Sequence, residues 1–422
     1  MLNQLAVLLT LGAGPSGRVF LYSPLDSVEG YSMEESFLSH FRSENRGIEV
    51  VERRLLGAEM AEAQVQEMHG ARFVSASSAR NLPRARQSEA HELAAQPGHA
   101  VFTITWGNKI PALVDGGLIA PVDGLLPKQY WADFYPRVLD TVTYQGRIWS
   151  LPLEATPYAL FCNLEHFCAG GVSLPTTWEE TLAAAQALTR DTDGDGTPNL
   201  WGYTQCTYQF PLLLWCYRIS IIREDGLAGF ADPPAAEVSR LYWALRECSP
   251  PHVEFERGDV AMKLSTYDDI NRYHHLDYAV IPLPRGACRA NSLGASGSTM
   301  GMVLLNGSDP EIAGRFLAFW ARPDIYLRWC VWTHAVALRK SVRESAAYQR
   351  FLLRVPEMRA FDGELECSVP RPVIPAYDAI HEVIAGYTRW VNVQPIEPSL
   401  QELQAKLDEA AAQANALLTA SR

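Results

Sequence analysis

The chain has 422 residues, of which 48% are hydrophobic and 20% charged, and its formal net charge is −12. This length exceeds what one compact core usually holds and predicts two globular units of about 150 to 200 residues each. The acidic balance argues against binding to nucleic acid or to an anionic membrane surface, because both would repel a negatively charged partner.

The N-terminal stretch 1–17 reads MLNQLAVLLTLGAGPSG. A short apolar run followed by small residues is typical of the end of a signal or leader segment, although this stretch has neither a basic start nor a lipid-attachment cysteine. Three of its glycines match a dinucleotide-binding fingerprint, but a strand pattern follows at 18–22, whereas the fingerprint must open a helix. We therefore interpret 1–17 as a leader remnant and not as a cofactor site.

Strand and helix patterns alternate from residue 18 onward. Residues 18–23 and 48–55 are rich in apolar and β-branched side chains and predict two strands. Between them, Ser32 and Glu35 form the pattern of a capping box, which predicts a helix that buries Phe41. The order strand, helix, strand is that of an α/β protein.

The next segment contains one stretch without clear periodicity. Residues 71–97 are polar and irregular, so we expect a long loop or insertion there. Residues 99–106, HAVFTITW, predict a strand, and residues 108–117 predict a helix. Trp106 therefore ends a strand, and ligands of open α/β sheets bind beyond the carboxyl ends of the strands.

The stretch 174–203 contains a helix signal, an acidic loop and an apolar run in that order. Thr177 and Glu180 form a capping box at the start of the helix. Three aspartates and two glycines then build the loop, and residues 200–203 favour a strand. Together they predict one αβ unit.

This stretch resembles the corresponding segment of the family 1 extracellular solute-binding proteins, the capture subunits of bacterial sugar importers of the ABC type. Members of that family carry a "TWEE" helix, then "DTDGDG", then a "WGY" or "YGF" strand. Further segments of the chain are similar to other motifs of the family, namely GRIWSLP at 146–152, RGDVAM at 257–262, YAVIPLP at 278–284 and HAVALRKSV at 334–342.

The resemblance implies an α/β fold of the two-lobed, type II periplasmic-binding-protein kind. Each lobe would be a sheet flanked by helices, and the lobes would close on a ligand by bending at a hinge. We expect the N-terminal lobe to comprise 18–155 and 293–340, and the C-terminal lobe to comprise 156–292 and 341–422.

The predicted ligand site combines flat rings with polar groups. A pyranose packs its C–H faces on rings, whereas its hydroxyls need donors and acceptors, and core packing is the competing account for each ring. Trp106 is the strongest candidate, because family members place an aromatic contact there. The predicted ligand contacts are Tyr22, Asp26, Trp106, Asn108, Glu154, Tyr158, Trp215, Tyr267, Asp268, Ser296 and Trp332.

The acidic loop predicts at most a weak calcium site. Asp191, Asp193 and Asp195 alternate as in the first half of a calcium-binding loop, and Gly196 permits the sharp turn. The acidic residue expected at the twelfth position is replaced by Gly202. A solvated turn without an ion is the alternative, and no other cofactor is expected.

The eight cysteines form no CxxC pair and show no spacing typical of zinc ligands. An even number permits disulfides in an exported protein. Their apolar neighbours, as in LLLWC and RWCVW, favour buried free thiols instead.

The function that we expect is that of a solute-binding protein without catalytic residues. It would be a monomer in the periplasm or outside the cell, would bind a sugar or short oligosaccharide, and would deliver it to an ABC permease. One alternative is a secreted glycan-cleaving enzyme with Glu154, Asp268 or Asp26 as its acid and base. A ligand sensor for a signalling receptor is the other, and neighbouring permease genes would argue against it.

Overall fold

The computed structural model describes residues 16–23, 27–28, 31–32, 37–54, 84–206, 208–250, 255–293 and 299–421. Its strands are β1 (Gly17–Ser23), β2 (Ser27–Val28), β3 (Tyr31–Ser32), β4 (Ile48–Arg54), β5 (His99–Trp106), β6 (Ile119–Ala120), β7 (Thr143–Tyr144), β8 (Arg147–Ile148), β9 (Ser150–Glu154), β10 (Ala159–Asn163), β11 (Met262–Ser265), β12 (Tyr278–Pro282), β13 (Asn291–Ser292), β14 (Met300–Leu305) and β15 (Ser368–Val369). Strands and helices alternate along much of the chain.

The helices are α1 (Ser39–Glu44), α3 (Arg84–Ala94), α4 (Ile110–Asp115), α5 (Lys128–Ala132), α6 (Pro136–Asp140), α7 (Leu164–Gly170), α8 (Trp178–Leu188), α9 (Gln209–Cys216), α10 (Ala235–Glu247), α11 (Pro310–Trp320), α12 (Pro323–Thr333), α13 (Lys340–Arg343), α14 (Ala346–Arg354), α15 (Met358–Asp362), α16 (Tyr377–Asn392) and α17 (Leu400–Ala420). Short 3₁₀ turns, among them η3 (Gly107–Lys109) and η5 (Tyr267–Asp269), follow the ends of β5 and β11. None of the described helices is both long and apolar enough to cross a bilayer.

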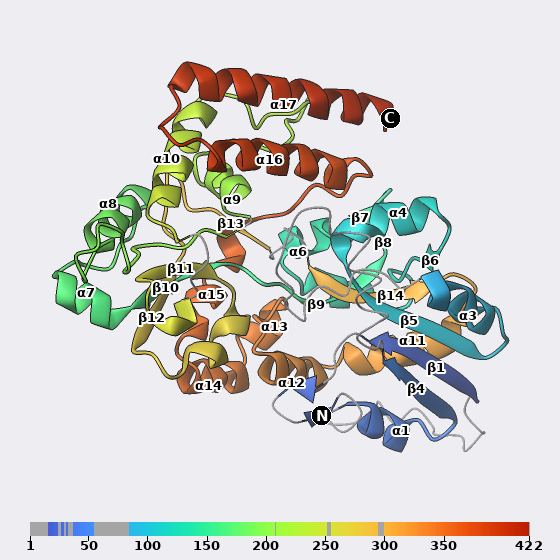
Figure 1. The fold of residues 1–422 in the computed structure, drawn as a ribbon. Helices are drawn as coiled ribbons and strands as arrows, with labels where there is room; N and C mark the ends of the chain where they lie inside the picture. Colours follow the sequence, from blue (N-terminus) through green and yellow to red (C-terminus); the bar gives the residue numbers. More distant parts are fainter. Residues whose placement is uncertain are drawn as a thin grey trace, which may run out of the picture.

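The first lobe is built on a six-stranded sheet with the order β4-β1-β5-β14-β6, in which β9 also pairs with β14. β1 runs parallel to β4 and β5, whereas β14 is antiparallel to β5, β6 and β9. Figure 1 shows β14, from the last third of the chain, lying beside β5. The sheet is therefore completed by a strand from a distant part of the sequence.

Alternation of side chains along β1 explains how this sheet is covered. Val19 and Leu21 face the larger core, where α11 and the buried Phe41 of α1 pack. Phe20 points to the other face and packs with Ala90 and Ala94 of α3. One strand thus contributes to both faces, as expected for a sheet with helices on each side.

Gly301 permits the close pairing of β14 with β9. A Cβ atom at this position would lie 2.4 Å from the carbonyl oxygen of Leu151 and 2.4 Å from Oγ of Ser150. The register between the two strands shifts at Met300 and Gly301. A larger residue would force β9 away from the sheet, so glycine is required here for steric reasons.

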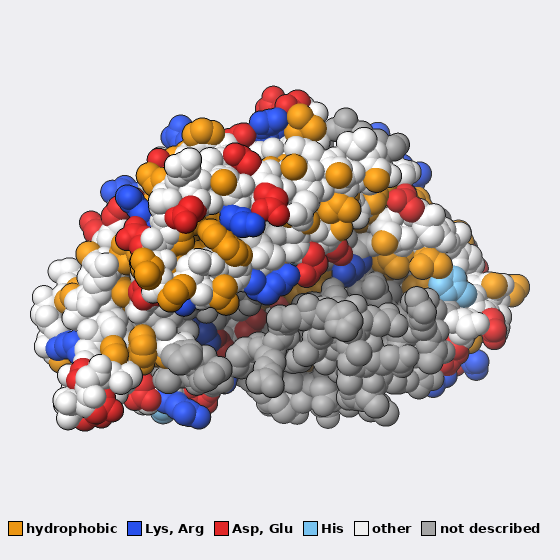
Figure 2. All heavy atoms as spheres, turned by 45° about the horizontal axis from the view of Figure 1, so that its top comes forward, with side chains coloured by type: hydrophobic (Ala, Val, Ile, Leu, Met, Phe, Trp, Pro, Cys, Tyr) orange, Lys and Arg blue, Asp and Glu red, His pale blue; other side chains and the backbone are white. Residues whose placement is uncertain are grey.

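The second lobe contains the antiparallel sheet β11-β10-β12 and a layer of helices that includes α8, α9, α10, α16 and α17. Leu160 and Cys162 of β10 pack in the core that these helices cover. Phe161, between them, points the other way and packs against Phe361 of α15, with ring centroids 6.1 Å apart. Acidic and basic side chains are interspersed over the face of the molecule in Figure 2.

Two segments far apart in sequence are joined by β13 and β15, which pair in parallel. The fully buried Glu364 accepts hydrogen bonds from Arg289 at 2.7 Å and from Asn291 at 3.0 Å. Asn291 also holds the backbone of Tyr158, with its Nδ2 atom 2.7 Å from the carbonyl oxygen. We call Glu364, Arg289 and Asn291 the crossing network, because they join three segments distant in sequence.

Several predicted elements are present. Thr177 and Glu180 make the expected capping box of α8, and α17 starts with another at Ser399. All eight cysteines are free, and four of them are buried, as the sequence predicted. The division into lobes at residues 155, 292 and 340 stays a prediction.

Three local predictions were wrong, namely the helix start at Ser32, the loop at 71–97 and, as described in the next paragraph, the strand at 200–203. Ser32 lies in β3 and does not start a helix, because it pairs with Ser27, although Phe41 is buried as expected in α1. The predicted loop 71–97 contains α3, and residues 71–83 lie outside the described residues. The helix was missed because the residues that it buries fully are alanines, Ala90 and Ala94, which give a weak periodic signal.

The apolar run 200–203 forms isolated bridges and no regular strand. Trp201 bridges to Val260, but the amide of Tyr203 turns to the carbonyl of Cys248. Gly202 packs so tightly on α8 that a Cβ atom would lie 1.9 Å from the carbonyl oxygen of Ala185. This contact with the helix replaces a continuous ladder.

Candidate functional site

Two of the predicted ligand contacts lie at the same edge of the first sheet. Trp106 ends β5 and Glu154 ends β9, and both pair with Met300 of β14. β5 and β9 run in the same direction, so their carboxyl ends lie at one edge. Both side chains are largely buried, Trp106 with 4% and Glu154 with 6% of its surface exposed.

The side chains of Glu154 and Asp268 act on each other, and we call these two residues the acidic pair. The phenol of Tyr267 acts on Glu154 as well. Burial and the Asp268 carboxylate raise the pKa of Glu154 to about 8, while the Tyr267 hydroxyl acts in the opposite direction. Solvent reaches Asp268, yet protein surrounds it closely, and this loss of hydration raises its pKa to about 6. Glu154 therefore holds a proton more tightly than an ordinary carboxyl group does.

Helix α12 places the thiol of Cys330 near Glu154. The pKa of this buried thiol is raised to about 12 by burial and, among smaller effects, by the charge of Glu154. Trp332 lies two residues further along and therefore points to another side of the helix. It keeps 9% of its surface exposed and packs on Phe37 with ring centroids 5.5 Å apart, so most of this ring is used in packing.

Tyr158 and Trp215 lie in the second core. Tyr158 is 5% and Trp215 8% exposed. Burial raises the pKa of the Tyr158 hydroxyl far above its usual value, with smaller contributions from Cys206 and Tyr208. Tyr208, which the sequence did not single out, stacks on His381 at 4.8 Å.

Asn108 does not join the acidic pair but binds to the start of α16. Its Nδ2 atom donates to Asp378 at 3.3 Å, and Lys109 forms an ion pair with the same carboxylate at 2.9 Å. Arg371 also binds Asp378 and lies 4.0 Å from the centre of the Tyr377 ring. Although burial alone would raise the pKa of Asp378, the nearby Arg371 and Lys109 charges lower it overall. The sequence analysis missed this cluster, because its members are about 270 residues apart.

Three predicted contacts have no described side chain. The backbone of Tyr22 lies near the end of β1, whereas its side chain is outside the described part of the structure. Asp26 and Ser296 also lie outside the described residues. The complete set of ligand contacts therefore stays a prediction.

The acidic loop brings its three carboxyl groups together. One oxygen each of Asp191, Asp193 and Asp195 lie within 4.8 Å of one another, and all three residues are exposed. The amides of Gly196 and Gly194 donate to Asp191 at 2.8 and 2.6 Å, and mainly these bonds lower the pKa of that carboxyl. The loop is thus closed by its own backbone, and calcium binding stays untested.

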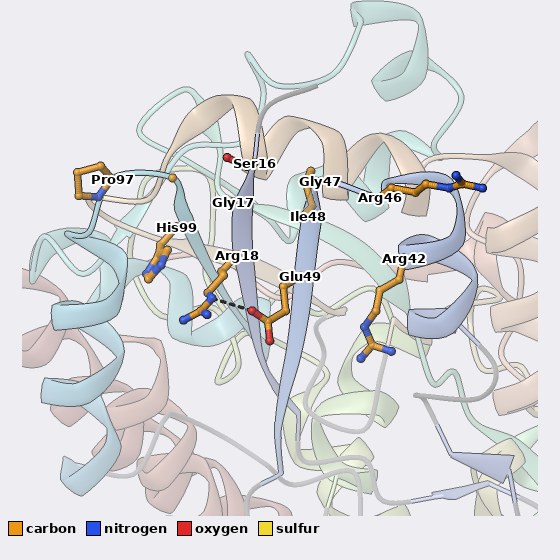
Figure 3. A pocket seen from close by; sticks show the side chains of 11 residues that line it. Ser16, Gly17, Arg18, Arg42, Arg46, Gly47, Ile48, Glu49, Pro97 and His99 are labelled. Carbon is orange, nitrogen blue, oxygen red and sulfur yellow. Dashed lines mark ion pairs between the residues drawn. The ribbon is translucent and has the colours of Figure 1, made fainter. Parts of the chain in front are cut away.

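A separate hollow of about 550 Å³ lies at the opposite end of the first sheet. It surrounds the amino ends of β1, β4 and β5, and Arg18 pairs with Glu49 at 2.7 Å across it. Figure 3 shows Arg42 and Arg46 extending in different directions, so these basic groups do not converge on one anion. This hollow is far along the strands from Trp106 and shares no residue with the predicted site.

The family model for bacterial extracellular solute-binding proteins matches residues 67–351 of this chain, which is more than half of its length. The chain belongs to this family. Solute binding is therefore its class of function, and the predicted family is confirmed. A candidate binding protein of Brucella abortus is 24% identical over 329 residues, which span 72% of this solute-binding protein and 76% of the relative.

Solved structures agree with the two-lobed fold. The cyclic α-maltosyl-1,6-maltose binding protein of Arthrobacter globiformis superposes with a TM-score of 0.73 at 19% identity, covering 96% of this solute-binding protein and 99% of that chain. An ABC substrate-binding protein of Listeria monocytogenes, in complex with cycloalternan, gives 0.70 at 15% identity, covering 96% and 99%. At these identities the likeness establishes the fold, and the predicted α/β architecture is confirmed.

Proposed function

We propose that this solute-binding protein captures a sugar or short oligosaccharide between its lobes and delivers it to the membrane permease of an ABC transporter. The observation that carries this proposal is the likeness, over 96% of the chain, to a maltosyl-maltose binding protein and to a substrate-binding protein in complex with cycloalternan. The Listeria protein is also named as an ABC component. The protein would act in the periplasm or outside the cell, as a monomer.

The chemistry of the strand edge suits a saccharide. The carboxyl groups of Glu154 and Asp268 lie near each other and near the Tyr267 phenol, and Trp106 pairs with the same residue of β14, Met300, as Glu154 does. Carboxyl groups bind sugar hydroxyls through strong hydrogen bonds, whereas aromatic rings pack on the C–H faces of a pyranose. Such a site would hold a sugar without breaking a bond in it.

Thermal unfolding with a panel of sugars tests the binding function. A ligand that binds only the folded protein should raise the melting temperature progressively with its concentration, and calorimetry should show saturation. The panel should include linear and cyclic oligosaccharides, monosaccharides and polyols. If no member shifts the melting temperature at millimolar concentration, saccharide capture is the wrong proposal.

Small-angle scattering tests the closure that capture requires. We expect a smaller radius of gyration at saturating sugar than in its absence, because ligand bound between two lobes draws them together. A non-binding sugar of equal mass and concentration is the control for solvent contrast. An unchanged radius at saturation would argue against hinge closure.

A glycan-cleaving enzyme is the second candidate, and the raised pKa of Glu154 beside Asp268 is the observation that favours it. Hydrolases of this class keep one of two carboxyl groups protonated. Product analysis after long incubation with each bound oligosaccharide separates the two functions. Recovery of intact saccharide supports binding, whereas cleavage that is lost in Glu154→Gln would identify an enzyme.

A further inference from the structure

Some buried carboxyl groups of this protein have an arginine partner, whereas another has none among the described residues. Among the described acidic residues, Glu154, Asp362 and Glu364 are buried, with 6%, 7% and 0% of their surface exposed. Asp362 pairs with Arg343 at 2.9 Å, and Glu364 pairs with Arg289 at 2.7 Å. Glu154 has no lysine or arginine within ion-pair distance in the part of the chain that the structure describes.

Asp268, the second member of the acidic pair, also lacks a cation among the described residues. Its one hydrogen bond there comes from the Thr266 hydroxyl, at 3.0 Å. The nearest lysine in sequence, Lys263, binds Asp269 at 2.8 Å and is therefore already used. Glu154 and Asp268 repel each other when both are ionised, and no described residue offsets that repulsion.

The hydroxyl of Tyr267, beside the acidic pair, is a further polar group whose hydrogen bonding is incomplete among the described residues. Tyr267 is 2% exposed, and its buried hydroxyl lacks a well-formed hydrogen bond among the described residues. The charges of both Glu154 and Asp268 act on this hydroxyl. A buried hydroxyl whose hydrogen bond to the neighbouring Glu154 is poorly formed costs free energy unless a ligand supplies a better one.

We propose that the ligand carries a positively charged amino group, which binds between Glu154 and Asp268, and that it is an amino sugar. This inference rests on the proposed function for its sugar part only. An ammonium group has three donors, enough for both carboxylates and the Tyr267 oxygen. It would also supply the positive charge that no described residue provides to the acidic pair.

A neutral sugar would use the same groups differently. Its hydroxyls would bind the protonated form of Glu154, so its affinity would not depend on a negative charge there. An ammonium group, in contrast, requires the ionised form. The groups that act on Glu154 are the Asp268 carboxylate and the Tyr267 hydroxyl, and Asp269 acts on Asp268. The pH dependence of affinity therefore separates the two kinds of ligand.

The test is calorimetric titration with matched pairs of sugars. Glucosamine, galactosamine, mannosamine and the glucosamine disaccharide of chitosan are compared with glucose, galactose, mannose and cellobiose at pH 7 and pH 5. We expect one amino sugar to bind at least ten-fold more tightly than its neutral parent at pH 7. Binding of the ammonium group must displace the proton of Glu154, so the preference should shrink further at pH 5, where the ionised fraction of this carboxyl is even smaller than at pH 7.

Variants assign the preference to the acidic pair. Glu154→Gln and Asp268→Asn should each remove most of it, so that the amino sugar and its neutral parent bind each variant with about equal affinity. Glu397→Gln, an exposed carboxylate on the surface, is the matched control and should leave the preference unchanged. Melting temperatures without ligand show whether each variant folds.

Each outcome bears on one of the two proposals. Neutral parents that bind as tightly as amino sugars would overturn the amino-group inference and leave saccharide capture standing. Binding of spermidine that is lost in Glu154→Gln, with no sugar bound, would support the positive charge and refute the sugar. If none of these compounds binds, both are refuted.

Discussion

Glu364 of the crossing network and Glu154 of the acidic pair are two buried carboxyl groups that differ in their counter-charges. In the crossing network, Glu364 is fully buried and is bound by Arg289 and Asn291. In the acidic pair, Glu154 is almost as deeply buried but has no lysine or arginine partner among the described residues, and the Asp268 carboxylate acts on it instead. The two glutamates thus have similar burial and opposite electrostatic surroundings.

We interpret the paired Glu364 as a residue that stabilises the fold and the unpaired Glu154 as a residue that binds the ligand. A paired buried carboxylate is neutral in its effect or stabilising once formed, whereas an unpaired one costs stability at neutral pH. An unpaired buried carboxyl group such as that of Glu154 therefore lowers the free energy of unfolding at neutral pH. Changes at each region should therefore act in opposite directions, and the following experiments measure this.

The largest effect is expected at the crossing network. Glu364→Ala leaves the buried Asn291 amide without its acceptor, takes the partner from the half-exposed Arg289 and empties a buried volume, so we expect a loss of about 3 to 4 kcal/mol in the free energy of unfolding. Chemical denaturation without ligand measures it. Glu366→Ala is the matched control, because Glu366 is exposed and its ion pair with Arg343 should contribute no more than about 1 kcal/mol. Equal losses in both variants would remove the distinction between the two regions.

Substitution of Trp106 tests whether one residue at the strand edge contributes both to folding stability and to ligand binding. Its 4% exposure predicts that Trp106→Ala loses about 3 kcal/mol of folding stability. If the ring also contacts ligand, sugar binding should weaken by about 2 kcal/mol at a temperature where the variant is folded. Trp178→Ala in the second core should lose stability alone. Unchanged affinity in Trp106→Ala would show that this ring only packs.

Glu154→Gln should stabilise the ligand-free protein at high pH. The folded-state pKa of about 8 lies above the ordinary value of 4.5, so the stabilising effect of the proton is complete below pH 4.5 and is lost as the pH rises through 8. We expect the variant to exceed the natural protein by about 2 kcal/mol at pH 9 and by little at pH 5. Urea unfolding at both pH values measures this. A less stable variant at pH 9 would mean that Glu154 has a partner after all.

The smallest effect is expected at the acidic loop. Asp191 already accepts two backbone hydrogen bonds, and the loop is exposed, so any calcium should bind weakly. A chelator should change sugar affinity less than two-fold. Calorimetry with calcium, and with Asp191→Asn as the control, decides whether an ion binds at all. A large loss of sugar affinity on chelation would contradict the peripheral role given to this loop.

Local sequence signals predicted much of the fold. The capping boxes at Thr177 and Ser399 and the Asp309 cap of α11 involve residues three or fewer positions apart, so their geometry follows from the sequence alone. The carboxyl end of β5 was likewise located by a strand pattern that ends in Trp106. Such interactions depend on the chain within one turn or strand.

What the sequence did not reveal depends on distant partners. Lys109 and Asp378 meet across about 270 residues, and Glu364 meets Asn291 across 73. No periodicity encodes those contacts. The charge balance of the acidic pair was equally hidden, because it depends on which carboxylates receive an arginine and which do not. The site was predicted as a set of residue types and not as an electrostatic arrangement.

The place of β14 in the first sheet has a consequence for synthesis on the ribosome. β14 fills the position between β5 and the pair β6 and β9, yet it follows β5 by about 200 residues. At roughly 5 to 20 residues per second, the edge of β5 waits about 10 to 40 s for its neighbour. During that interval the exposed strand edge is open to wrong pairing. A nascent chain of this protein would therefore depend on a holding chaperone before its first lobe assembles.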